Sequence, residues 1–319
     1  MRKNFKHIIA ICTIGTVSWI MVQSPNINQY VTKLKSEAVT VTKNQDLLYE
    51  EIQEKAKKYE VEPKDAMIDS VWKTVPGYNG LKVDIHSSYK VMRKDGKFDE
   101  KKLIFKQIPP KLHIDQLQAA PIYRAHPEKP VVSFLINVAW GNEYIPQMLS
   151  ILKKHQVKAT FFLEGKWTKN NPELAKMIEE SGHEIGNHSY SHPNMKTLSA
   201  SLIRKEIQQT NDIIKAVTGV QCKLFAPPSG AFRDETISIA DEFKMDTIMW
   251  SVDTIDWQKP SPSVLTERVL HKIHNGAFVL MHPTESTTKS LETLIVNMKN
   301  KKLHITTVSE ALSEERIMQ

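Results

Sequence analysis

The sequence predicts an α/β fold built around a parallel sheet, and three observations support this. The 319 residues are 40% hydrophobic, which supplies enough apolar side chains for a full core. After Pro130, short apolar runs alternate with longer amphipathic runs, the pattern of strands that are each followed by a helix. Seven such pairs fill about 190 residues, which predicts a barrel one unit short of the usual eight. A doubly wound open sheet has the same alternation and is the alternative.

Each expected strand is a short apolar run, and each expected helix places its apolar residues on one face. The strands are expected at Val131–Asn137, Lys158–Leu163, His183–Asn187, Cys222–Ala226, Asp246–Ser251, Ala277–His282 and Leu303–Thr307. The helices are expected at Glu143–His155, Asn171–Ser181, Ser199–Val217, Asp234–Phe243, Ser263–His274, Thr288–Lys299 and Ser309–Arg316. Together they define one expected domain over residues 131–319.

A small α+β module is expected before the barrel, over residues 43–119. Apolar residues at four-residue steps, Leu48, Ile52 and Ala56, predict its first helix. The expected elements are helices at Gln45–Tyr59 and Lys64–Thr74 and a strand at Leu103–Ile108. Residues 120–130 contain three prolines and are expected to form the linker to the barrel.

The first 25 residues have the layout of an export signal. Three basic residues precede Ile8–Val22, a run of fifteen uncharged and mostly apolar residues. A membrane-spanning helix usually needs about 20 residues, and Pro25 follows the nearest small-residue cleavage pattern. Residues 1–25 are therefore expected to be a signal peptide or a signal anchor, and the protein is expected to be exported.

The net charge of +7 lies entirely in the first part of the chain. Residues 1–126 contain 21 basic and 14 acidic residues, whereas the remaining 193 residues contain 22 of each. A neutral barrel offers no field to a phosphate backbone, so no nucleic-acid partner is expected. The basic N-terminal region is instead expected to attract anionic membrane or wall polymers.

Polar side chains gather just after the expected strands, where ligand sites form in parallel α/β folds. His188 and His192 follow the third strand, and two imidazoles four residues apart can converge on one divalent ion. Asp256 follows the fifth strand and His282 ends the sixth. A carboxylate beside such a histidine fixes its tautomer. No Walker-type glycine loop and no G-x-S-x-G turn is present in the sequence.

Four segments together resemble the polysaccharide deacetylases, also called the NodB-homology domain or carbohydrate esterase family 4. They are Lys158-Ala159-Thr160-Phe161-Phe162, His188-Ser189-x-x-His192, Asp253-x-x-Asp256-Trp257 and Leu280-Met281-His282. The resemblance covers Lys129 to about Thr307. It implies a distorted (β/α)7 barrel and metal-dependent hydrolysis of N-acetyl groups on a peptidoglycan or chitin-like glycan. The run Trp140–Tyr144 is similar to the branch of spore-forming Gram-positive bacteria, which implies a cell-envelope or spore-cortex setting.

The resemblance also implies roles for individual residues. His188 and His192 match the two histidines that, with an Asp, hold a metal ion, usually Zn²⁺. His282 matches the catalytic acid, and Asp256 matches the carboxylate that orients it. The groove for the glycan is expected to be lined by Trp140, Pro228 and Trp257.

The first motif of the family, Thr-Phe-Asp-Asp-Gly, has no counterpart with carboxylates in this chain. Counting back from Thr160 without a gap places Asn137 on the catalytic base and Val138 on the metal ligand. A slip of one residue offers Ile136 or Ala139, so neither register restores an Asp. The Arg of the third motif, which holds the base ionised, is replaced by Ala226.

The sequence therefore predicts two alternative functions. The first is an impaired or divergent deacetylase of cell-wall or spore-cortex amino sugars, with Zn²⁺ on the two histidines. Loss of a general base alone lowers a rate by about 10²- to 10⁴-fold. The alternative is a non-catalytic protein of the cell envelope or spore that binds a glycan or acts as a scaffold.

Overall fold

The computed structural model describes Trp19 and residues 24–318, leaving out the side chains of residues 26 and 36–46. The chain forms two compact units. The first comprises Met1–Val61 and Leu81–Lys106, and the second comprises Glu62–Gly80 and Gln107–Gln319. This division differs from the expected boundaries, because residues 62–80 and 107–119 of the expected module belong to the unit that contains the barrel.

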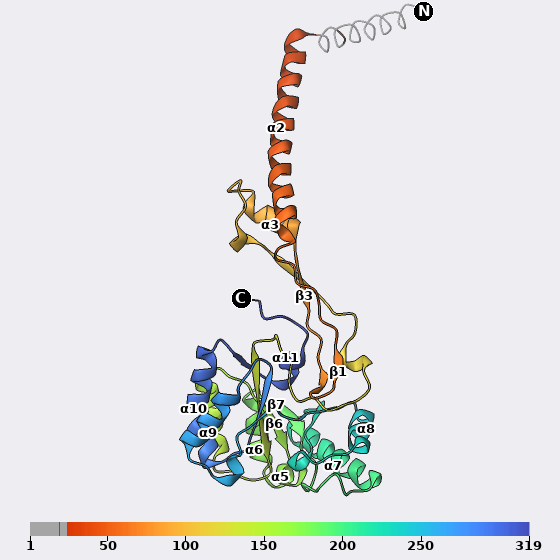
Figure 1. The fold of residues 1–319 in the computed structure, drawn as a ribbon, viewed down its shortest axis with the longest axis vertical. Helices are drawn as coiled ribbons and strands as arrows, with labels where there is room; N and C mark the ends of the chain where they lie inside the picture. The colour runs from red at the N-terminus through yellow and green to blue at the C-terminus, as the bar shows by residue number, and fades with distance from the viewer. Residues whose placement is uncertain (1–18, 20–23, 319) are drawn as a thin grey trace, which may run out of the picture. The chain divides into compact units, whose positions relative to one another are not determined.

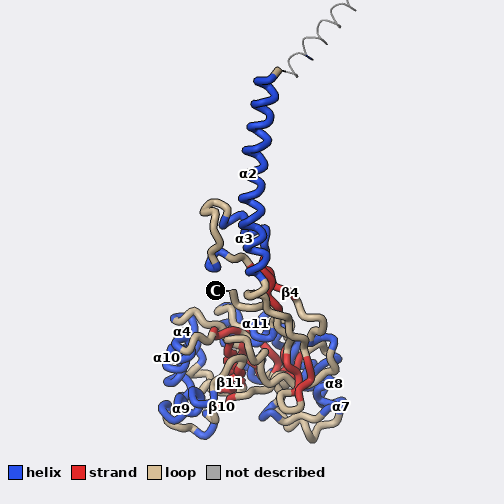
Figure 2. The backbone as a smooth tube through the Cα atoms, turned by 45° about the horizontal axis from the view of Figure 1, so that its top comes forward, coloured by secondary structure: helices blue, strands red, loops and turns tan. Residues whose placement is uncertain are grey.

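A curled parallel sheet forms the centre of the second unit, as the alternation of strands and helices predicts (Figure 2). Its strands are β5 (Val131–Val138), β6 (Thr160–Leu163), β7 (Glu184–Asn187), β8 (Leu224–Phe225), β9 (Asp246–Thr247), β10 (Val252–Asp253), β11 (Ala277–Met281) and β12 (His304–Thr306). Their order is β10-β11-β5-β6-β7-β8-β9, and β12 also pairs with β5. Within the described residues no strand pairing joins the two ends, β9 and β10. The expected distorted barrel is confirmed as a curled sheet that stays open.

Most helices of the second unit cover the outer face of this sheet (Figure 1). They are α4 (Ile145–Lys154), α5 (Gly165–Asn170), α6 (Pro172–Glu180), α7 (Ala200–Thr218), α8 (Asp234–Glu242), α9 (Pro262–Lys272) and α10 (Glu285–Asn300). The last helix, α11 (Val308–Leu312), packs instead with residues of the inner face. All seven expected barrel helices are present, and α5 is an additional one. In Figures 1 and 2, α9 and α10 lie on one flank of the sheet, and α7 and α8 lie on the other.

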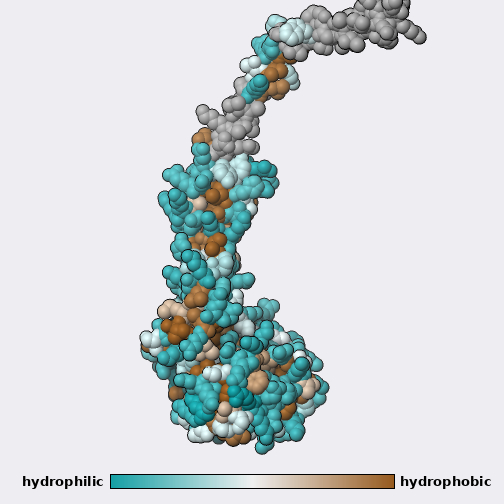
Figure 3. Space-filling view, turned by 90° about the vertical axis from the view of Figure 1, so that its right-hand side faces the viewer, coloured by the Kyte–Doolittle hydropathy of each residue, from teal (hydrophilic) through white to brown (hydrophobic). Residues whose placement is uncertain are grey.

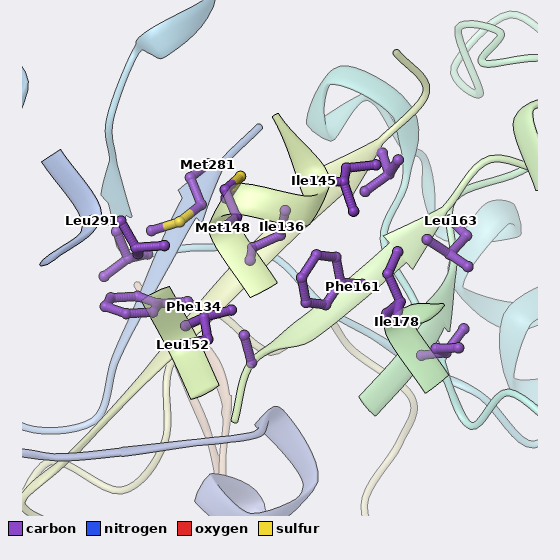
Figure 4. Close-up of a cluster of buried hydrophobic side chains, with 14 of the residues drawn as sticks. Phe134, Ile136, Ile145, Met148, Leu152, Phe161, Leu163, Ile178, Met281 and Leu291 are labelled. Atoms are coloured by element: carbon purple, nitrogen blue, oxygen red, sulfur yellow. The ribbon is translucent and has the colours of Figure 1, made fainter. Parts of the chain in front are cut away.

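The two faces of β5 pack against different layers, because successive side chains of a strand point to opposite sides. All eight of its residues are buried. Its even-numbered residues, Val132, Phe134, Ile136 and Val138, belong to the large cluster that contains residues of the covering helices. Figure 4 shows Phe134 and Ile136 in this cluster, close to side chains of α4 and α10. Val131 and Leu135 belong to a second cluster, so the odd-numbered residues face the inside of the curl.

The expected linker is part of the barrel wall. Ile122 is 1% exposed and forms a parallel bridge with Ile248, just after β9. Two residues later, Arg124 forms an antiparallel bridge with Ala277 at the start of β11. The segment therefore lies between β9 and β11, and it pairs with backbone groups at the place where the sheet is open.

The first unit is built on two helices. α2 (Pro25–Ala56) begins with Pro25 at its first turn and contains most of the expected helix Gln45–Tyr59. The expected stripe is confirmed, since Leu48 and Ile52 pack on Met92 of α3 (Ile85–Met92). Sequence patterns did not predict α3, whose N-terminal cap is the Asp84 carboxylate that accepts from Ser87 N.

The expected helix Lys64–Thr74 is wrong. The segment forms a β-hairpin instead, in which β1 (Met67–Asp69) pairs antiparallel with β2 (Lys73–Val75). The Asp69 carboxylate accepts hydrogen bonds from the backbone N–H groups of Val71 and Trp72 and thereby fixes the turn. A further two-stranded sheet joins β3 (Gly80–Val83) to β4 (Phe105–Ile108), which confirms the expected strand near Leu103–Ile108.

No helix in the described part of the chain is long and apolar enough to cross a membrane. The predicted signal peptide or anchor at residues 1–25 lies almost wholly outside the described residues. The surface visible in Figure 3 is hydrophilic over most of its area, with hydrophobic side chains in scattered patches.

We expect acid to destabilise the second unit through two buried histidines. His126 and His183 are each 7% exposed, and burial lowers the pKa of both imidazoles to about 4. The unfolded chain takes up these protons near pH 6.5, so the free energy of unfolding is complete above that pH and falls as the pH drops toward 4. Urea unfolding at pH 5 should show a loss of about 1–2 kcal/mol per histidine relative to pH 7.5.

Each imidazole also accepts a backbone hydrogen bond, His126 from Glu128 N and His183 from Ala159 N. The variant His183→Gln should therefore reduce the difference in stability between pH 7.5 and pH 5. The exposed His304→Gln is the control and should leave that difference unchanged. If His183→Gln shows the same difference in stability between pH 7.5 and pH 5 as the unmodified protein, His183 is not a cause of the acid destabilisation.

Candidate functional site

The carboxyl ends of the parallel strands surround one cavity of about 460 Å³. Its lining residues are Asn137, Ala139, Trp140, His188, His192, Ser229, Trp250, Asp253, Trp257, Leu280 and His282. This is the edge at which parallel α/β folds bind their ligands. The structure thus brings together the three predicted histidines, Asn137 and two of the three predicted groove residues.

His188 lies directly after β7 and is 1% exposed. Its Nδ1 atom lies 2.8 Å from the carbonyl oxygen of Ala226, to which it donates, so Nε2 keeps its lone pair. Burial, with smaller contributions from His192 and His282, lowers the pKa of His188 to about 3. A neutral imidazole with a free Nε2 is the form that binds metals.

His192 completes the histidine pair at the exposed end of the loop. The two rings meet edge to face, with their centroids 5.0 Å apart. Partial burial lowers the pKa of His192 from its ordinary value. The residue adopts a left-handed backbone conformation with φ of 55°, which is strained for a residue with a side chain.

The residues present do not fit the three-ligand metal site of the family. The histidine pair supplies two nitrogen donors, but a site of this type needs a third protein ligand. Across residues 24–318 no group of three His, Cys, Asp or Glu side chains is placed to hold a metal ion.

The carboxylate and histidine of the acid arm are joined as predicted. Asp256 is completely buried, and its carboxylate accepts from His282 Nδ1 at 2.8 Å and from the His282 backbone N–H at 2.6 Å. Thr287 Oγ1 donates a third hydrogen bond at 2.6 Å. These contacts fix the ring of His282 with its Nε2 edge free, which is the orientation that an acid or a hydrogen-bonding group requires.

The end of β5 contributes no carboxylate to the cavity. Asn137 lines it and is 5% exposed, and its Oδ1 atom is buried without a hydrogen-bond partner. Val138 is completely buried in the cluster under the helices, so the gap-free placement of Val138 at the metal ligand is corrected: its side chain points away from the cavity. Ala139, the next residue, does line the cavity.

Gly141 identifies the register of the first motif. Its φ is +83°, and an added Cβ atom would lie 2.1 Å from the carbonyl oxygen of Pro283, so only glycine fits. The family motif ends in glycine, and aligning that glycine with Gly141 places Ala139 and Trp140 on the two Asp positions. Both line the cavity, and the indole of Trp140 stacks on the His282 ring, with centroids 5.8 Å apart and an angle of 9° between the rings.

Two of the predicted groove residues border the cavity, and one does not. Trp140 and Trp257 are 46% and 58% exposed, and both also line an adjoining cavity of about 610 Å³. Pro228 is buried, and the structure places Ser229 on the cavity wall in its stead. Trp250 was missed because the expected strand Asp246–Ser251 included it, whereas β9 ends at Thr247.

The fold and these strand-end residues define a carbohydrate esterase fold with an incomplete catalytic set. A family model described as polysaccharide deacetylase matches residues 124–248. The chain belongs to the polysaccharide deacetylase family.

Its relatives include both active and inactive members. The chain is 54% identical over 319 residues, the whole of both chains, to the uncharacterized protein YlxY of Bacillus subtilis. It is 35% identical over 164 residues to a peptidoglycan-N-acetylglucosamine deacetylase of Bacillus cereus, covering 50% of this chain and 60% of that protein.

Among solved structures, a wild-type pseudoenzyme of carbohydrate esterase family 4 from Bacillus anthracis is 57% identical, with a TM-score of 0.81. The match covers 85% of this chain and 96% of that one. A mutant of the same pseudoenzyme, described as having restored enzymatic activity, also has a TM-score of 0.81. The similarity to a pseudoenzyme agrees with the impaired or divergent activity that the first motif predicts.

Proposed function

We propose that this protein binds an amino-sugar glycan of the cell envelope without hydrolysing it. One observation carries the proposal. Asn137, Ala139 and Trp140 present no carboxylate at the end of β5, whereas Asp256 and His282 on the other side of the cavity are hydrogen-bonded to each other. A general base, a metal ligand and the arginine of the third motif are therefore missing from a cavity that keeps the histidine pair and the pair of Asp256 and His282.

The walls of the cavity suit a sugar. Trp140 and Trp257 expose their indoles beside the cavity and its neighbour. Aromatic side chains of this kind offer apolar area together with a polar edge. Since the related enzyme of Bacillus cereus is named for peptidoglycan N-acetylglucosamine, a peptidoglycan-like strand is the glycan that we propose, and the cell envelope is the proposed location.

The first unit has a cluster of exposed basic side chains. Its exposed basic side chains on α3 and the segment that follows are Lys90, Arg93, Lys94, Lys97 and Lys101. Such a cluster attracts anionic polymers, with a strength that falls as salt is added. We propose that this unit contacts anionic wall or membrane components.

The test measures binding and hydrolysis on the same preparation. Full-length protein in mild detergent should sediment with purified peptidoglycan and release no acetate from it, even with added Zn²⁺ or Co²⁺, while the Bacillus cereus deacetylase releases acetate in parallel. Trp257→Ala should weaken binding by about tenfold, and Leu202→Ala, which removes another exposed apolar side chain, should not. Acetate release comparable to that of the active enzyme, or absence of sedimentation, would contradict the proposal.

A further inference from the structure

The cavity at the strand ends is rich in aromatic side chains and poor in charged ones. Three indoles line it, those of Trp140, Trp250 and Trp257. Asp253 is the one carboxylate among its lining residues, and none of the eleven is Lys or Arg. A cation is attracted to the face of an indole, and more strongly in a partly desolvated site. The cavity walls therefore favour a positively charged group.

Asp253 is held at the end of β10 with one oxygen engaged. Its Oδ1 atom accepts from the backbone N–H of Ile255 at 2.8 Å, and Oδ2 has no hydrogen-bond partner among the described residues. The side chain is partly exposed. The carboxylate is thus fixed in position by the protein and keeps acceptor capacity for a ligand.

No basic side chain competes for this carboxylate inside the cavity. Ala226 occupies the position of the motif arginine, and only its carbonyl oxygen acts here, as the acceptor for His188 Nδ1. That hydrogen bond leaves His188 Nε2 as an acceptor rather than a donor. The Nδ1 atom of His282 is already paired with the buried Asp256 carboxylate. The groups that face the cavity therefore include one unpaired negative charge and no unpaired lysine or arginine.

We infer that the cavity selects the protonated amine of a de-N-acetylated amino sugar, with Asp253 as its counter-ion and the three indoles as its walls. This inference rests on the proposed function and names its ligand class. An acetamido group is neutral, so neither the carboxylate nor the indole faces would favour it by charge. The barrel would then recognise the product of a deacetylation reaction instead of its substrate, and no bond is made or broken.

The inference predicts a preference between two ligands of equal length. Isothermal titration of the full-length protein at pH 7 should show that the glucosamine tetramer binds at least about tenfold more tightly than the N-acetylglucosamine tetramer. An amine of this kind loses its proton near the α-amino range, about pH 7.7–8.0. At pH 9 the preference should shrink by about fivefold or more, because the amine of the ligand is then mostly neutral. The imidazoles of His188, His192 and His282 also face the cavity.

Variants separate charge recognition from general binding. Asp253→Asn should abolish most of the preference and leave the affinity for the N-acetylated tetramer within about twofold. Glu173→Gln, which removes an exposed carboxylate on α6, is the matched control and should change neither affinity. If Asp253→Asn fails to fold, the pH dependence of the unmodified protein decides alone.

The outcomes distinguish this inference from the proposed function. Equal or tighter binding of the N-acetylated tetramer would overturn the inference and leave glycan binding standing. Binding of neither tetramer and no sedimentation with peptidoglycan would overturn both. A preference for the glucosamine tetramer that persists unchanged at pH 9 would also overturn the inference, because it would not depend on the charge of the amine.

Discussion

Replacing Ala139 and Trp140 together by Asp should create deacetylase activity in this chain. Both residues line the cavity opposite the intact pair of Asp256 and His282, and the register given by Gly141 places them on the two Asp positions of the family motif. Acetate release from N-acetylated chitooligosaccharides with added Zn²⁺ should rise by about 10²- to 10⁴-fold over the unmodified protein, which is the range that a general base supplies.

The control for this experiment places the same two carboxylates in the gap-free register. Asn137→Asp with Val138→Asp should gain no activity and should lose several kcal/mol of stability, because residue 138 is completely buried among apolar side chains. Activity in this variant and not in the Ala139 and Trp140 variant would show that the register is wrong. Adding Ala226→Arg to the active variant should raise the rate further, since an arginine keeps a neighbouring carboxylate ionised.

Gly141→Ala should destabilise the second unit more than Gly219→Ala does. The new Cβ atom would lie 2.1 Å from the carbonyl oxygen of Pro283, and φ of +83° is unfavourable for a residue with a side chain. Steric overlap with a backbone atom cannot be relieved by a rotamer change, so the loop after β5 or the loop after β11 must move. We expect a loss of about 3 kcal/mol or more in urea unfolding.

Gly219→Ala is the matched control. Gly219 has φ of +76° at the C-terminal cap of α7, and a Cβ atom there would meet no atom within 4 Å. Its cost should be that of the left-handed backbone alone, about 1–2 kcal/mol. Equal losses in the two variants would mean that the contact with Pro283 contributes nothing.

The barrel was predictable because its strands and helices have different hydrophobic periods. β5 is buried on both faces and reads as a continuous apolar run, and α4 repeats its apolar residues at helical spacing. The short elements were not predictable. β1 and β2 have three residues each, and the turn between them depends on hydrogen bonds to Asp69, so the expected helix Lys64–Thr74 had no long periodic pattern to support it.

The residues of the site that lie in motifs retained from the family were predictable, and the residues that replace the first motif were not. His188 and His192 follow one strand, and Asp256 pairs with His282 across two loops as the family motifs imply. Counting back from Thr160 misplaced the first motif by two residues, because it assumed a fixed length for the segment between the motif and β6. The alternation of buried and cavity-facing side chains along β5, together with the close contact of Gly141, resolves it.

The strand-like segment at Ile122 bears on where a working fragment of this protein can begin. Ile122 N donates to Thr247 O, and Met249 N donates to Ile122 O, so removing the segment would leave paired backbone groups of the barrel wall without partners. A fragment that starts at residue 131 would expose the edge of β9 and invite strand pairing between molecules. Fusion and truncation designs should therefore keep the chain from at least Pro121 onward.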